Sequence, residues 1–91
     1  MKLRDALYNW LQMDIVSRQR PNDGAAKETL DFFAAILQED HSLTEIHAAL
    51  TDEDTYTISY IHQGERTEIR FDRSDAEKLW HEIESNPKYN E

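Results

Sequence analysis

The residues of this 91-residue chain that could do chemistry together are a histidine, a serine and a glutamate. Strand pairing over residues 46–71 predicts that His47, Ser59 and Glu68 lie in one row on one face of a sheet. A hydrolytic triad uses these residue types, but it needs the histidine between the nucleophile and the acid, and here the serine is in the middle. A sheet face also offers neither a pocket nor an oxyanion hole. The row therefore indicates an ordinary polar face.

Histidines and carboxylates also raise the question of a metal site. Glu77 and His81 are four residues apart on an expected helix and could share a face, but no pattern places a third ligand beside them. Residues 52–54 resemble a fragment of a calcium loop that lacks its glycine and its distal glutamate. We interpret this segment as an acidic hairpin turn, and we expect no metal or other cofactor.

Anion and nucleotide sites are weakly indicated as well. Arg18 and Arg20 precede the start of a second expected helix, where an anion could bind, but Asp23 would compete for the same position. Gly24 and Gly64 are the only glycines, and the chain has no glycine-rich phosphate loop, HExxH or GxSxG motif. The sequence therefore contains no motif of an enzyme, and we expect none of its residues to be catalytic.

Two amphipathic helices are expected before the sheet. Apolar residues over 2–16 follow the i, i+3, i+4, i+7 spacing of a helix, and Asp14 occupies the last position of that stripe. Residues 15–16 belong either to the last turn of this helix or to an exit strand. Asn22 or Asp23 can cap a second helix that runs to about residue 39. Its apolar stripe is widened by Phe32 and Ile36, which indicates burial on more than one side.

The hydrophobic period changes from 3.6 to 2 after residue 42. Residues 46–50, 55–61 and 68–71 alternate as strands do, and Gln63-Gly64 is typical of a two-residue hairpin turn. With this turn, the aromatic and most aliphatic side chains fall on one sheet face, and a slip by one residue would scramble them. The expected pairs on that face are His62–Glu65, Tyr60–Thr67, Ile58–Ile69 and Tyr56–Phe71, with Leu50 opposite Tyr56 and Ala48 opposite Ile58.

The fold class predicted from these elements is α+β. Ser74 and Glu77 form a capping box for a last helix, which Asn86-Pro87 ends. The order is then α-α-β-β-β-α, with a three-stranded antiparallel meander whose apolar face is covered by helices packed on that one face. We expect a single domain over residues 1–85 and a short polar tail over residues 86–91.

Charge and composition restrict the partners. Ten Lys and Arg against 19 Asp and Glu give a net charge of −9, which disfavours nucleic acid and anionic membranes. The chain has no cysteine, no signal peptide and no apolar run long enough to cross a membrane, so we expect a cytoplasmic, soluble protein.

These expectations favour a non-catalytic binding or regulatory module that acts through protein–protein contact. The expected partner is a protein, for which a basic surface would complement the acidic chain, or a second copy of the chain. The expected surface is the outer sheet face with Ile61 near its centre. A small-ligand-binding protein or enzyme, with a pocket lined by Tyr56, Tyr60 and Trp10, is the alternative. Mimicry of nucleic acid by the carboxylates is a third possibility. The expected partner surface consists of His47, Thr57, Ser59, Ile61, Glu68 and Arg70.

Overall fold

Six elements follow one another in the expected order in the computed structural model, which describes residues 1–85. The α+β class and the order α-α-β-β-β-α are confirmed, and the tail expected over residues 86–91 lies outside the described residues. The elements are α1 (Leu3–Gln19), α2 (Gly24–Glu39), β1 (Leu43–Asp52), β2 (Thr55–His62), β3 (Glu65–Asp72) and α3 (Arg73–Ser85).

The helix ends follow local capping chemistry. Residues 15–16 lie inside α1, so they do not form an exit strand. Asp23 is the N-cap of α2, and its carboxylate accepts a hydrogen bond from the Ala26 N–H at 3.1 Å. The capping box predicted at Ser74 is wrong, because β3 continues directly into α3 at Arg73. The Asp72 carboxylate instead accepts from the Asp75 N–H at 3.4 Å.

The sheet has the order β1-β2-β3, so β2 is central and both of its neighbours are edge strands. Gln63 and Gly64 have φ values of 52° and 80°, as both central residues of a type I′ turn do. Each pair expected from this turn is present, from His62–Glu65 to Tyr56–Phe71. The pairing of β1 with β2 is irregular near both ends of β1 and regular over residues 47–50.

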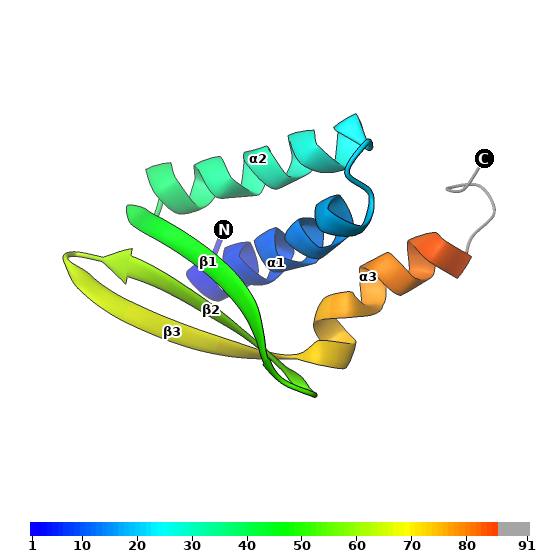
Figure 1. Ribbon diagram of the computed structural model, residues 1–91. Coiled ribbons are helices and arrows are strands. Elements are labelled where there is room, and N and C mark those ends of the chain that lie inside the picture. The colour runs from blue at the N-terminus through cyan, green and yellow to red at the C-terminus, as the bar shows by residue number, and fades with distance from the viewer. Residues whose placement is uncertain (86–91) are drawn as a thin grey trace.

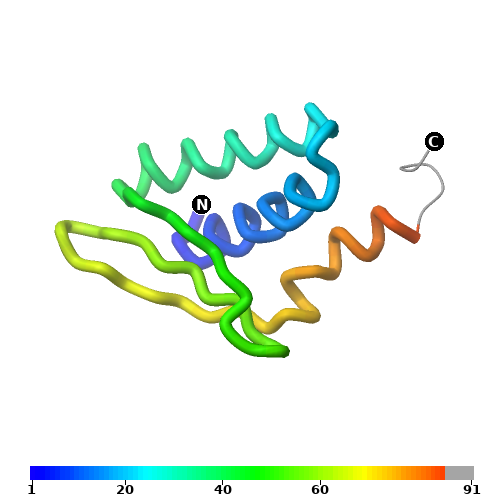
Figure 2. The backbone as a smooth tube through the Cα atoms, in the orientation of Figure 1, coloured from blue at the N-terminus to red at the C-terminus, as the bar shows by residue number. Residues whose placement is uncertain are grey.

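The inner sheet face and α1 form the core. Leu7 and Leu11 of α1 and Ile58 of β2 are fully buried in one cluster, together with Tyr60 and Phe71, which are 6% exposed. Figure 1 shows α1 over the sheet, with α2 and α3 on either side of it, and the backbone trace in Figure 2 shows the same arrangement. The three helices therefore cover one sheet face, and no helix of residues 1–85 covers the other.

Helix α2 departs from expectation. The predicted burial on more than one side is wrong at Phe32, whereas Ile36, the other residue that widens the stripe, packs against the core. Helix α2 packs along α1 and contacts the sheet at the edge strand β1. Phe32 is 59% exposed and its ring rests edge-on against Phe33, at 5.3 Å between ring centroids. No element among residues 1–85 packs on that side of α2. Within the same range, no helix has both the length and the hydropathy that are needed to cross a bilayer.

The paired residues Ile58 and Ile69 provide a test of the facing assignment. Ile58 is fully buried and its partner Ile69 is half-buried. Ile58→Ala is expected to lower the free energy of unfolding by about 2–5 kcal/mol, because it opens a cavity in the core. Ile69→Ala should cost less than about 2 kcal/mol, since solvent already reaches that side chain. Urea denaturation measures both, and equal losses would contradict the assignment.

Candidate functional site

The outer sheet face brings together the residues that the sequence placed there. His47 stands opposite Ser59, which stands opposite Glu68, and Thr57 stands opposite Arg70. The row is therefore present with the serine in its middle, in the order that a triad cannot use. His47, Glu68 and Arg70 are exposed, so they are available to a partner.

The centre of that face is less accessible than expected. Thr57 is only 7% exposed, and Ser59 and Ile61 are half-buried, so Ile61 is not the exposed apolar centre that was predicted. The cause is the central position of β2, whose side chains are flanked on both sides. Thr51 also forms a hydrogen bond with Thr57, with 2.8 Å between the two hydroxyl oxygens. The accessible part of this face is therefore its margin.

The turn decides which backbone groups each strand offers. Residues that flank a two-residue turn exchange backbone hydrogen bonds, so His62 and Glu65 form such a pair. Every second residue of β2, counted from His62, then bonds to β3, and the residues between them bond to β1. Thr57 and Ser59 belong to the second set. The same alternation fixes the backbone of both edge strands.

On β1, this alternation leaves two apolar residues whose backbone groups point away from the sheet. His47 and Ala49 are the partners of Ser59 and Thr57, so they bond to β2. Ala48 and Leu50 therefore direct their backbone N–H and C=O away from the sheet. No turn, loop or cap hydrogen bond within residues 1–85 takes up these groups. Leu50 is also 44% exposed.

On β3, the outward residues are all charged. The residues that alternate with its hydrogen-bonded positions are Arg66, Glu68 and Arg70, and all three are exposed. Charged side chains on an edge strand oppose pairing with another strand. Edge β3 is therefore protected in this way, whereas the regular part of edge β1, residues 47–50, contains no aspartate, glutamate, lysine or arginine.

A cleft of about 240 Å³ lies beside the β1 edge. One wall comes from the last turns of α1, and the other comes from β1 and β2. The two outward residues of β1, Ala48 and Leu50, are part of this second wall. The lining consists of Asp14, Ile15, Arg18, Gln19, Ala48, Ala49, Leu50 and Tyr56.

Asp14 is the unusual residue of the cleft. Its side chain is 13% exposed, and its Oδ2 accepts the Arg18 Nε–H at 3.0 Å, whereas the Arg18 side chain is 66% exposed. Burial raises the pKa of Asp14 from its ordinary value, and the nearby Arg18 charge offsets only part of this effect. The folded protein therefore holds a poorly solvated carboxylate at an otherwise apolar position of α1.

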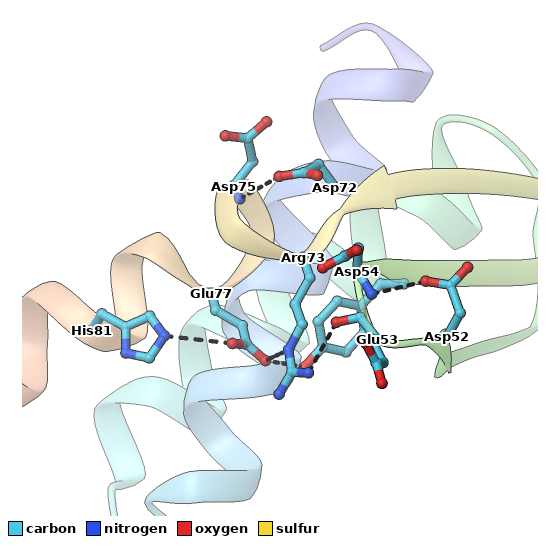
Figure 3. Close-up of polar contacts among 9 residues, drawn as sticks. Asp52, Glu53, Asp54, Asp72, Arg73, Asp75, Glu77 and His81 are labelled. Atoms are coloured by element: carbon cyan, nitrogen blue, oxygen red, sulfur yellow. Dashed lines mark hydrogen bonds and ion pairs between the residues drawn. The ribbon is translucent and has the colours of Figure 1, made fainter.

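A hydrogen-bonded network connects the cleft to α3. Tyr56 donates its hydroxyl proton to Glu77 Oε2 at 2.6 Å, and the same oxygen accepts from Arg73 Nε at 3.1 Å. Arg73 also donates to the Glu53 carbonyl at 3.1 Å, and Figure 3 shows it between Glu77 and the β1–β2 turn. These contacts hold the hairpin and α3 in one relative position.

The same network shifts the pKa of two of its members in opposite directions. Burial and the hydrogen bond to Glu77 raise the pKa of Tyr56 to about 12. Burial opposes ionisation of Glu77, but the hydrogen bonds from Tyr56 and Arg73 outweigh it and lower the pKa of this carboxyl. Both shifts describe a structural network, because each group is already occupied by a neighbour.

The other candidate residues have ordinary surroundings. His81 lies 3.4 Å from Glu77 Oε1, and no group of three histidine, aspartate or glutamate side chains gathers as metal ligands would in the described part of the chain. Arg20 pairs with Asp23 at 3.1 Å. Of the three aromatic residues expected around a pocket, Trp10 and Tyr60 are buried in the core and Tyr56 lines the cleft.

Asp14 and the β1 edge are the features that sequence reasoning missed. A signal for Asp14 was present, since it is the charged residue at the end of an apolar helical stripe. The outward direction of the backbone N–H and C=O groups of Ala48 and Leu50 also follows from the predicted turn. Comparison with models of protein families, with curated proteins and with solved structures finds no match, so the function is argued from this geometry.

The network predicts a loss of stability at alkaline pH. The pKa of Tyr56 is about 12 in the folded protein and ordinarily 10.0, so its stabilising contribution is complete below pH 10 and is lost as the pH rises towards 12. The loss is at most about 2–3 kcal/mol. Tyr56→Phe should remove it, so the two unfolding free energies should converge between pH 10 and 12. Parallel curves would contradict this assignment.

The Asp14 carboxylate is expected to give no net stabilisation at pH 7, unlike the carboxylate of an ordinary ion pair. Its folded-state pKa is raised, so protonation would stabilise the fold at acid pH, and this stabilisation is absent at pH 7. Asp14→Asn, which is neutral, should therefore leave the free energy of unfolding at pH 7 unchanged or raise it by less than about 1 kcal/mol. Thermal and urea denaturation measure it. A clear loss of stability would assign Asp14 a structural role.

Proposed function

We propose that this protein is a non-catalytic binding module that acts through protein–protein contact at the β1 side of its sheet. The observation that supports this proposal is the difference between the two edges. Edge β3 presents Arg66, Glu68 and Arg70, whereas edge β1 presents Ala48 and Leu50 with their backbone N–H and C=O directed outward. An extended segment of a partner can add to such an edge as a further strand.

The surroundings of the β1 edge suit a bound segment. In Figure 1, α2 approaches the start of β1 and diverges from its end, and the cleft beside Ala48 and Leu50 lies towards that end. Side chains of an added strand alternate between the two sheet faces. One set would enter the cleft, and the other would lie on the outer face beside His47 and Ala49, which are both exposed.

The alternative is a small-ligand-binding protein or enzyme, and the polar groups Asp14 and Tyr56 in the cleft favour it. Size opposes it, because the cleft holds about 240 Å³, whereas pockets that enclose small ligands measure roughly 300–1,000 Å³. The Tyr56 hydroxyl is also already bonded to Glu77. The cleft thus suits one side chain of a bound segment better than it suits a whole ligand.

A short neutral strand-forming peptide tests the proposal. We expect acetyl-Thr-Val-Thr-Gln-Thr-Val-Thr-amide to shift the backbone amide signals of Ala48 and Leu50 in a ¹H–¹⁵N NMR titration. Ala48→Pro removes one outward N–H without breaking the ladder to β2, so it should weaken binding about tenfold or more.

Glu68→Pro is the matched control, because it removes one outward N–H from the opposite edge. It should leave the affinity for the peptide unchanged. Absence of peptide binding, or binding that shifts β3 instead of β1, would overturn the proposal. Circular dichroism of both variants verifies that each is folded.

A further inference from the structure

We infer that the segment bound at the β1 edge is basic and places a lysine or arginine side chain in the cleft against Asp14. This inference rests on the proposed function and adds the chemistry of the partner. Asp14 and Leu50 line the same cleft, and Leu50 is one of the two residues whose backbone would pair with the added strand. A side chain directly opposite Leu50 lies on the same sheet face as Leu50 does, which is the cleft side.

Asp14 has capacity for a second cation. Its ion pair with Arg18 uses Oδ2, so Oδ1 lies outside that pair. The Arg18 side chain is mostly exposed to solvent, so it can move away from Asp14 or share the carboxylate with another cation. Because Asp14 is largely buried, an added cation would meet a poorly hydrated carboxylate, for which a charge-assisted hydrogen bond is stronger than at an open surface.

Charge around the edge favours the same class of partner. Glu45 lies before the regular part of β1, and residues 52–54, which follow it, are all acidic. The exposed cation that lines the cleft is Arg18. A basic segment that lay along residues 47–50 would therefore have carboxylates near both of its ends and the Asp14 carboxylate in the cleft beside it, in a protein whose net charge is −9.

A second copy of the chain fits the edge poorly for the same reason. A two-fold antiparallel pairing that places Ala48 of one copy opposite Leu50 of the other brings Glu45 of each copy towards residues 52–54 of the other. Like charges opposite one another destabilise paired strands. The same surface that attracts a basic strand thus opposes self-association.

Three peptides test the inference. They share the sequence acetyl-Thr-Val-Thr-X-Thr-Val-Thr-amide and carry Lys, Gln or Glu at the central position X. Valine and the central residue share one strand face, so they would face the cleft together. We expect the Lys peptide to bind at least about fivefold more tightly than the Gln peptide, and the Glu peptide to bind most weakly. Isothermal titration or NMR titration measures the three affinities.

The variant Asp14→Asn distinguishes binding of the lysine side chain in the cleft from general electrostatic attraction between a basic peptide and an acidic protein. It should reduce the preference for Lys over Gln to less than about twofold, whereas Glu53→Gln, which removes a carboxylate from the β1–β2 turn, should keep most of the preference. Both variants have the same net charge, so a difference between them reports position. Equal loss of preference in both would overturn the role of Asp14.

The outcomes distinguish the inference from the proposed function. If all three peptides bind at Ala48 and Leu50 with equal affinity, the edge is a binding site but the basic partner is wrong. If none binds there, both proposals are wrong. Dimerisation through the β1 edge in sedimentation analysis, abolished by Ala48→Pro, would show that the occupant is a second copy and would also overturn the inference.

Discussion

In the turn at residues 63–64, both φ values are positive, and this local geometry places His62 opposite Glu65. The alternation of an antiparallel ladder carries that one pairing along the whole sheet. It directs Ile58 towards α1 and determines which strand each backbone group of β2 faces. It also determines, one strand further away, that the free groups of β1 belong to Ala48 and Leu50. The core and the proposed binding edge thus depend on the same short segment.

The two edges of the sheet differ because their outward residues differ in charge. Both edges have unpaired backbone groups, and such groups can pair with any extended chain. On β3, the groups belong to residues whose charged side chains oppose a neighbour. On β1, irregular pairing near both ends shortens the regular segment to residues 47–50, but that segment itself has no charged barrier. The proposed strand addition would therefore occur on β1 and involve only a short segment.

The sheet was predictable from sequence because its information is local and periodic. A two-residue turn and an alternation of period 2 suffice to give the register, and the register gives the inner face. Burial on the outer face was not predictable in the same way. Thr57 is covered by Thr51, whose position depends on irregular pairing near the β1–β2 turn, and no periodic pattern reports an irregularity. The width of the α2 stripe was likewise misleading, because apolar residues such as Phe32 can remain in solvent.

The start of α3 shows how tertiary contacts can override a local motif. Ser74 and Glu77 have the spacing of a capping box, yet Glu77 bonds to Tyr56 and Arg73 instead. A carboxylate at the surface gains little from a cap that water can replace, whereas at this position it accepts hydrogen bonds from two side chains at once. Asp14 presents the contrasting case. Its only recorded partner within residues 1–85 is a mostly exposed arginine, so the fold bears a desolvated charge without full compensation. A lysine or arginine of the proposed partner would supply the compensation that Arg18 gives only in part.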